Sequence, residues 1–240
     1  MTIYRCGQGL NGNPIKAVLF DVDDTLIDVA SGIEYGVRKT LVDMGFAYSE
    51  RLKEQLLDAA TKRIGKARRL YELRVLLSLR EVLGSNPFKT LEFAARMVVW
   101  IDKVRTVLAQ PVEGAPETLM HLKDKGYRLG VVSDMPASKF KALALRLRFL
   151  DELDVCVTRS DVAKTKPSPE GILLALNRMG LNPAQAVYVG NMPSDVEAGR
   201  RAGVRTVYYP GKLEDYFSKR SSECRADYVI KRISQLTDLL

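Results

Sequence analysis

Cysteine and histidine are scarce in this chain of 240 residues, which contains three cysteines and one histidine. Cys6, Cys156 and Cys224 are odd in number and far apart, which fits neither a disulfide framework nor a metal-binding spacing. We therefore expect reduced thiols and a cytoplasmic protein. The single histidine, His121, stands in a helix-like stretch, and we expect it to serve packing or the surface.

Long apolar runs are also missing. No segment approaches the roughly 20 residues that a membrane-spanning helix needs, so we expect no membrane partner. The first residues lack the basic stretch and apolar block of a secretion signal, and we expect none. A mean hydropathy of −0.10 and 46% hydrophobic residues are typical of a soluble globular protein.

The most informative segment is a short apolar run that stops at two carboxylates. Residues 16–26 read KAVLFDVDDTL, so Asp21 and Asp23 follow the run and Thr25 comes next. The uninterrupted run predicts a buried strand of a parallel sheet, and ligands of such sheets bind at the carboxyl ends of the strands. Close carboxylates repel each other, and a cation relieves the repulsion. The segment therefore favours metal-assisted chemistry on an anionic substrate.

The segments before and after this motif differ in character. Residues 1–14 are rich in Gly and Asn and are predicted to form a loop or a loosely attached leader. Their GQGLNG segment fits a dinucleotide-binding pattern, but no strand precedes it, so we assign it no function. Residues 30–110 place apolar residues at helical spacing, which predicts an all-helical insert of about four helices.

From Pro111 onward, strand-like and helix-like segments alternate. Strands are expected at 127–132, 155–157, 186–190, 206–209 and 227–230, and helix start signals at 114–117, 168–170 and 193–195. This alternation predicts an α/β fold with a doubly wound parallel sheet. The core would comprise residues 15–29 and 111–240, with the helical insert 30–110 between its two parts.

Polar side chains follow four of the expected strands, at the edge where ligands bind. Each of these residues alone is as typical of a turn as of a functional site, but their occurrence together at one edge of the sheet favours a site. They are Asp21, Asp23 and Thr25 after the first strand, Ser133 and Asp134 after the second, Lys166 after the third, and Asn191 and Asp195 after the fourth.

These segments resemble, in order, the four motifs of the haloacid dehalogenase superfamily of phosphotransferases and hydrolases. The motifs are DVDDTL at 21–26, VVS at 131–133, KPSP at 166–169 and GNMPSD at 190–195. The resemblance covers about residues 15–30 and 111–210. The helical insert resembles the small helical (C1-type) cap of phosphoglycolate phosphatase and β-phosphoglucomutase relatives.

The resemblance implies a Mg²⁺-dependent phosphatase that hydrolyses small phosphorylated metabolites through an aspartyl-phosphate. It makes Asp21 the nucleophile and Asp23 the general acid and base. Ser133 and Lys166 would contact the phosphoryl group and serve catalysis. The implied substrate-binding residues are Thr25, Ser133, Asp134 and Lys166, and the implied Mg²⁺ ligands are Asp21, the main-chain carbonyl of Asp23, Asn191 and Asp195.

Two positions depart from the family pattern. Asn191 stands where the family usually has an acid, and an amide oxygen attracts Mg²⁺ less strongly than a carboxylate does. We therefore expect Asp195 to carry more of the metal binding, directly or through water. Asp134 stands where the family often has Asn, and a negative charge beside a phosphate is unfavourable. We expect Asp134 to point away or to pair with a cation.

Three alternatives stay open. A metal-independent 2-haloacid dehalogenase tolerates an amide at the place of Asn191, but that branch lacks the second acid that is present here as Asp23. A sugar-phosphate mutase shares all four motifs. A non-catalytic binder is supported by the net charge of +8 and the basic segment 62–69, although the charges of that segment are typical of a solvated helix face. We do not expect a nucleic-acid partner, and the sequence leaves the substrate and the oligomeric state open.

Overall fold

The computed structural model describes residues 14–61, 80, 87–213 and 225–240. The chain divides into two compact units, one made of the residues up to Asp28 together with Ala109–Leu240, the other of Val29–Leu108. The predicted leader (except Pro14) and the basic segment 62–69 lie outside the described residues. None of the described helices is both long and apolar enough to cross a bilayer.

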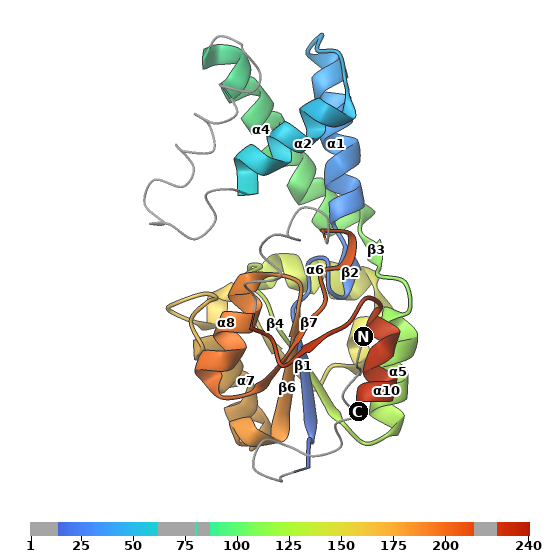
Figure 1. Ribbon diagram of the computed structural model, residues 1–240, viewed down its shortest axis with the longest axis vertical. Coiled ribbons are helices and arrows are strands. Elements are labelled where there is room, and N and C mark those ends of the chain that lie inside the picture. Colours follow the sequence, from blue (N-terminus) through green and yellow to red (C-terminus); the bar gives the residue numbers. More distant parts are fainter. Residues whose placement is uncertain (1–13, 62–79, 81–86, 214–224) are drawn as a thin grey trace. The chain divides into compact units, whose positions relative to one another are not determined.

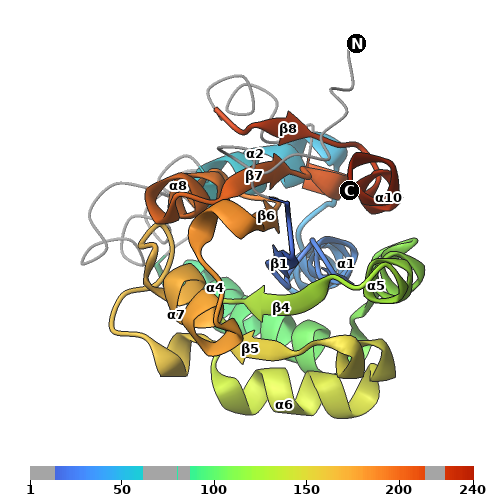
Figure 2. The ribbon, with the colours of Figure 1, turned by 90° about the horizontal axis from the view of Figure 1, so that it is seen from below.

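The first unit (Figure 1) is built on a six-stranded sheet in the order β5-β4-β1-β6-β7-β8, in which all neighbouring strands are parallel (Figure 2). The strands are β1 (Ala17–Phe20), β4 (Arg128–Val132), β5 (Val155–Val157), β6 (Ala186–Gly190), β7 (Arg205–Tyr208) and β8 (Tyr228–Val229). Each expected strand is present, and the predicted α/β fold class is confirmed. All four residues of β1 are completely buried, as its apolar run predicts.

Helices cover both faces of this sheet. They are α5 (Ala115–Asp124), α6 (Ala137–Arg146), α7 (Glu170–Met179), α8 (Pro193–Ala202) and α10 (Leu236–Leu239). Helices α7 and α8 lie on one face, and α5 and α10 lie on the other (Figure 2). Burial of apolar side chains between these layers, such as Leu19, Ile172 and Leu176, is the main source of the core's stability.

Short 3₁₀ turns connect several of these elements. They are η4 (Arg148–Glu152), η5 (Arg159–Asp161), η6 (Pro183–Gln185), η7 (Gly211–Leu213) and η8 (Ile233–Gln235). A small antiparallel ribbon, β2 (Ile27–Asp28) with β3 (Gln110–Pro111), joins the chain where it leaves the first unit to the chain where it returns. Two-residue strands are too short to give a period in sequence, and this ribbon was not predicted.

The second unit is helical throughout its described part. It contains α1 (Ala30–Asp43), α2 (Glu50–Thr61), α4 (Pro87–Lys103) and the π-helical turn η3 (Val104–Leu108). Its core is formed by Val37, Leu41, Leu56 and Phe93. Helices α1 and α4 approach closely at Gly36, where a Cβ atom would lie 2.9 Å from Cγ of Trp100, so a larger residue there would push the helices apart.

Candidate active site

The site residues gather where the strand order reverses around β1. Phe20, the last residue of β1, is in register with Val131 of β4 on one side and with Val189 of β6 on the other. The segments that follow these three strands therefore begin side by side at one edge of the sheet. This is the switch point at which open α/β sheets bind ligands, and it brings together the loops that carry Asp21, Ser133 and Asn191.

Lys166 links two acids at this edge. Its Nζ lies 2.6 Å from Asp21 Oδ1 and 2.8 Å from Asp195 Oδ1. The three side chains are almost fully buried, with 6%, 9% and 1% of the Lys166, Asp21 and Asp195 side chains exposed. A buried charge is tolerated only when it is paired and hydrogen-bonded, and each of these groups satisfies that condition.

The loop that carries Lys166 is held by a residue that the sequence did not single out. The Glu170 carboxylate accepts hydrogen bonds from the backbone N–H groups of Ala163 at 2.7 Å and Lys164 at 3.0 Å. Asp134 accepts a hydrogen bond from the backbone N–H of Lys166 at 3.3 Å. Asp134 is exposed and bonds to an amide, so its negative charge stabilises the loop that presents the lysine. A glutamate in the first turn of a helix is a common helix-start signal. The sequence alone therefore did not indicate that Glu170 binds the backbone of the preceding loop.

The loop after β1 is a compact turn. The N–H groups of Leu26 and Ile27 donate to the carbonyl of Val22, and the N–H of Asp24 donates to the carbonyl of Ile27 at 2.7 Å. Asp24 has a φ of +57°, in the left-handed region that L-residues other than Asn and Asp rarely adopt. Thr25 is completely buried inside this turn, and its Oγ1 makes no hydrogen bond to any described residue.

Ser133 presents a hydroxyl beside these acids. The backbone N–H of Ser133 donates to the carbonyl of Val157, and its Oγ accepts from the N–H of Met135 at 3.2 Å. Accepting that bond leaves the hydroxyl proton to be donated elsewhere. Ser133 therefore keeps a proton that it can donate at the edge of the sheet.

The oxygens of the fourth motif differ in their availability. Asp195 Oδ2 accepts from the N–H of Met192 at 2.8 Å, while Oδ1 receives Lys166. Close approach of this carboxylate is possible only at a glycine, because a Cβ on Gly190 would lie 2.5 Å from Asp195 Cγ. The buried Asn191 Oδ1, by contrast, accepts no hydrogen bond from any described residue. Buried polar atoms normally have a partner, so this oxygen is available to a water molecule or an ion.

Charge at this edge is unbalanced toward the negative. Burial raises the pKa of Asp21 to about 8, with the Lys166 ammonium opposing the shift and Asp195 and Asp23 adding to it. The Lys166 pKa is held well above its ordinary value by Asp195 and Asp21, despite burial. Oxygen ligands and excess negative charge suit Mg²⁺. No group of three or more His, Cys, Asp or Glu side chains is arranged around a metal position in the described part of the chain. A metal here would therefore depend on Asn191 and on main-chain oxygens in addition to acidic side chains.

Tyr188 is a member of this cluster that the sequence reasoning missed. It lies on β6 and is 1% exposed. Its hydroxyl lies 3.3 Å from Lys166 Nζ and donates to the carbonyl of Val132 at 3.0 Å. The segment AVYVG was interpreted only as a buried strand. A buried tyrosine nevertheless needs a hydrogen-bond partner for its hydroxyl, and that requirement is a signal that could have identified it.

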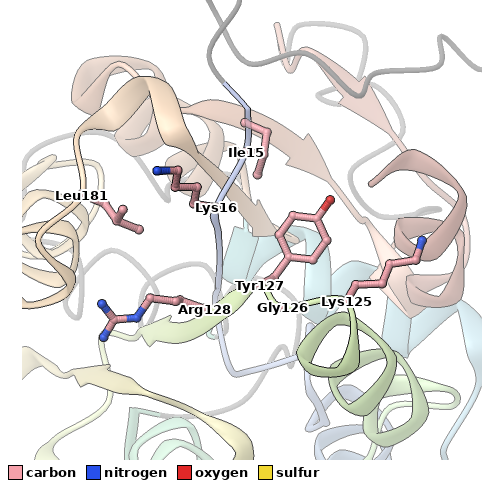
Figure 3. Close-up of a pocket in the computed structure, with 7 residues that line it drawn as sticks. All are labelled: Ile15, Lys16, Lys125, Gly126, Tyr127, Arg128 and Leu181. Atoms are coloured by element: carbon pink, nitrogen blue, oxygen red, sulfur yellow. The ribbon is translucent and has the colours of Figure 1, made fainter.

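The larger hollow of the first unit lies at the opposite ends of the strands. It measures about 330 Å³ and is lined by Ile15, Lys16, Lys125, Gly126, Tyr127, Arg128 and Leu181. Figure 3 shows Lys16, Arg128 and Leu181 on one side of β1 and Tyr127 on the other. This lining contains no carboxylate, whereas the recess beside Ser133, Asp134 and Lys166 is much smaller, about 10 Å³. The charged groups beside the smaller recess therefore mark the candidate site. The 330 Å³ hollow is larger, but none of its lining residues is a carboxylate that could act as a nucleophile.

Comparison with known proteins agrees with this geometry. Residues 15–203 match the family of haloacid dehalogenase-like hydrolases. The chain is 31% identical over 226 residues to the phosphoglycolate phosphatase of Aquifex aeolicus, covering 94% of this chain and 97% of that protein. It is also 31% identical over 235 residues to the glyceraldehyde 3-phosphate phosphatase of Methanothermobacter thermautotrophicus, covering 94% and 100%.

A solved structure shows the same fold. The crystal structure of a HAD-superfamily hydrolase of subfamily IA from Geobacter sulfurreducens superposes with a TM-score of 0.65 at 23% identity, covering 94% of this chain and 96% of that one. The family match spans most of the chain, and the two relatives match over nearly their whole length. The chain is therefore a hydrolase of the haloacid dehalogenase-like family.

Proposed function

We propose that this enzyme is a Mg²⁺-dependent phosphatase that hydrolyses small phosphorylated metabolites through an aspartyl-phosphate at Asp21. The observation that carries the proposal is the buried contact of Lys166 with Asp21 and Asp195 at the ends of the central strands. A nucleophilic carboxylate beside a fixed ammonium suits phosphoryl transfer, whose catalysis is mostly positioning and charge neutralisation.

In the first step, an Asp21 oxygen attacks phosphorus and forms the new P–O bond. The bond from phosphorus to the alcohol oxygen breaks, and the electron pair stays on that oxygen. Asp23, two residues along the same turn, delivers a proton to it. Ser133 donates its hydroxyl proton to a phosphoryl oxygen, and Lys166 stabilises the charge on the transferring group.

In the second step, Asp23 removes a proton from water, and the water oxygen attacks the phosphorus of the aspartyl-phosphate. The bond from phosphorus to the Asp21 oxygen breaks, which releases inorganic phosphate and returns Asp21 to its carboxylate form. One residue thus serves as acid in the first step and as base in the second.

The residues present fit a magnesium site. Asp21, Asn191 and the main-chain carbonyl of Asp23 would hold the ion, and Asp195 would contribute through water because both of its oxygens already have protein partners. When bound, Mg²⁺ supplies a divalent charge that draws the phosphoryl oxygens to Asp21 and neutralises the charge that develops on them. Asn191 contributes an unused buried oxygen but no negative charge.

The helical unit and the substrate belong to the same proposal. By resemblance, Val29–Leu108 is the cap that excludes water and selects the substrate, with hinges at residues 28–31 and 109–113. The phosphatases named above act on small phosphorylated carbon compounds by their names, so we propose substrates of that class for this chain. We also propose that the enzyme acts in the cytoplasm, where such metabolites are found.

A screen tests the proposed function. Phosphorylated metabolites and 2-haloacids are each offered to the enzyme with Mg²⁺ and with a chelator, and phosphate and halide are measured. We expect phosphate release that depends on Mg²⁺. Halide release that persists in the chelator would establish the dehalogenase alternative, which is compatible with an amide at position 191. Transfer of phosphate to a second position of a sugar phosphate, without net release, would establish the mutase.

A further inference from the structure

The Tyr188 hydroxyl occupies the centre of the buried polar cluster and is not part of any of the four motifs. It lies 3.0 Å from the carbonyl oxygen of Val132, 3.3 Å from Lys166 Nζ and 3.4 Å from Asp195 Oδ1. The hydroxyl therefore joins the backbone of β4 to the charged groups between β1 and α8. The tyrosine is 1% exposed, so its hydroxyl is shielded from bulk solvent.

The N–H groups of Lys166 and the acceptors around them determine which hydrogen bonds the Tyr188 hydroxyl makes. The Lys166 ammonium has three N–H groups and no acceptor, and three oxygens surround it: Asp21 Oδ1 at 2.6 Å, Asp195 Oδ1 at 2.8 Å and the Tyr188 hydroxyl at 3.3 Å. The single proton of the hydroxyl is donated along its shorter contact, to the Val132 carbonyl. The hydroxyl oxygen is then free to accept from Lys166, so every proton of the ammonium has a partner.

The ring contributes a second contact to the same group. Lys166 Nζ lies 6.0 Å from the centroid of the Tyr188 ring. That distance is at the outer limit of a cation–π interaction, so the ring adds little and the hydroxyl is the main contact. The lysine side chain has several rotatable bonds and is fixed only as far as its end group is held. With two acceptors in place of three, the ammonium would have more than one arrangement between the acids.

We propose that Tyr188 is a positioning residue, whose hydroxyl fixes the Lys166 ammonium against Asp21 for phosphoryl transfer. This inference rests on the proposed function, in which Lys166 stabilises the transferring group. It predicts a loss in kcat, because a loosely held ammonium is misplaced in the transition state. It predicts little change in KM, because Tyr188 is buried and is not one of the proposed substrate-binding residues.

The test compares Tyr188→Phe with Tyr208→Phe. Tyr208 is a matched control, since it is also completely buried and lies on the neighbouring strand β7. We expect Tyr188→Phe to lower kcat by about 10- to 100-fold with KM changed by less than about twofold, which is the size of effect that small misplacements cause. The control should keep kcat within about twofold of the wild type. Equal kcat values in the two variants would overturn the proposal.

A second measurement needs no substrate. The wild type and both variants are treated with an amine-acylating reagent, and the labelling rate of Lys166 is followed by mass spectrometry, with exposed Lys39 as the internal reference. We expect faster labelling of Lys166 only in Tyr188→Phe, because a mobile ammonium reaches the reagent more often. If the wild type hydrolysed no phosphate ester, the proposed function would fail, while the labelling would still decide whether the hydroxyl holds the lysine. Unchanged labelling, or a Tyr188→Phe variant that does not fold while Tyr208→Phe does, would assign the hydroxyl to the core and overturn the inference.

Discussion

Lys166 Nζ lies 2.6 Å from Asp21 Oδ1, although 145 positions separate the two residues in the chain. Burial and the Asp195 and Asp23 carboxylates raise the pKa of Asp21 to about 8, while Lys166 opposes the shift, so the ionised form of Asp21 is disfavoured. A divalent cation at this edge would stabilise the ionised form. The contact therefore connects the fold, which brings the loops together, to the proposed metal dependence.

Replacing Asn191 by Asp is expected to tighten Mg²⁺ binding by about tenfold or more, because a full negative charge replaces a neutral amide oxygen. The same charge adds to the repulsion among Asp21, Asp23 and Asp195 when no metal is bound. We therefore expect a lower Tm without Mg²⁺ and a larger rise of Tm when Mg²⁺ is added. Calorimetric titration and thermal unfolding measure these two effects without any substrate.

Asn177→Asp is the matched control for this substitution. Asn177 is exposed in the last turn of α7, at the end of the helix opposite the candidate site, and its replacement makes the same change of charge. The control should leave the Mg²⁺ titration unchanged. If Asn191→Asp gave the same titration as the wild type, the Asn191 side chain would not be a ligand.

Asp24 should tolerate glycine and reject a β-branched residue. Its φ of +57° costs an ordinary L-residue roughly 1–2 kcal/mol, and glycine has no such penalty. We expect Asp24→Val to lower the free energy of unfolding by about 1–2 kcal/mol relative to Asp24→Gly. Urea unfolding of the two variants measures the difference. Equal midpoints would show that the turn after β1 adjusts its backbone without cost.

The Asp161–Arg178 pair should make stability depend on pH in the acid range. Arg178 bonds to Asp161 Oδ1 at 2.8 Å, and the N–H and hydroxyl of Thr158 both donate to Oδ2 at 2.8 Å. These donors lower the pKa of Asp161 to about 2, against an ordinary 3.8. A lowered folded-state pKa contributes stability above the unfolded pKa, and that contribution is lost as the pH falls toward 2.

Asp161→Asn should therefore lower the free energy of unfolding by about 1 kcal/mol near neutral pH, a value reduced for solvent screening of this partly exposed pair. The difference from the wild type should shrink between about pH 5 and pH 2. Asp151→Asn, which removes an exposed partner of Arg148, is the control and should change the free energy of unfolding little, because solvent screens such a surface pair. A difference between Asp161→Asn and the wild type that stayed constant with pH would contradict the assigned ion pair.

The sequence predicted the elements of the core but not all of their interactions. The apolar run before Asp21 and the alternation after Pro111 were sufficient for the sheet, because burial between two helical layers imposes those patterns. The polar residues after four strands were expected to share one edge of the sheet, and the structure places Asp21, Lys166 and Asp195 in contact there. These features could be predicted because they depend on residue type and spacing.

What could not be predicted depends on orientation in three dimensions. Tyr188 reads as a core residue of β6, and only the structure places its hydroxyl beside Lys166. Glu170 reads as an ordinary first-turn acid, and only the structure shows it holding the backbone of the loop before it. Asp134 was expected to point away or to pair with a cation; its carboxylate accepts the backbone N–H of Lys166, and its charge also acts on the Lys166 ammonium.

The central claim is that Asp21 carries the phosphoryl group during turnover. The most direct test mixes the enzyme with a hydrolysed phosphate ester and Mg²⁺, quenches the mixture in acid within one turnover, and maps the peptides by mass spectrometry. The account predicts a phosphoryl group on the peptide that contains Asp21, and neither this group nor turnover in the Asp21→Asn variant. Hydrolysis by Asp21→Asn at a rate near that of the wild type, or a phosphoryl group found on a different residue, would contradict it.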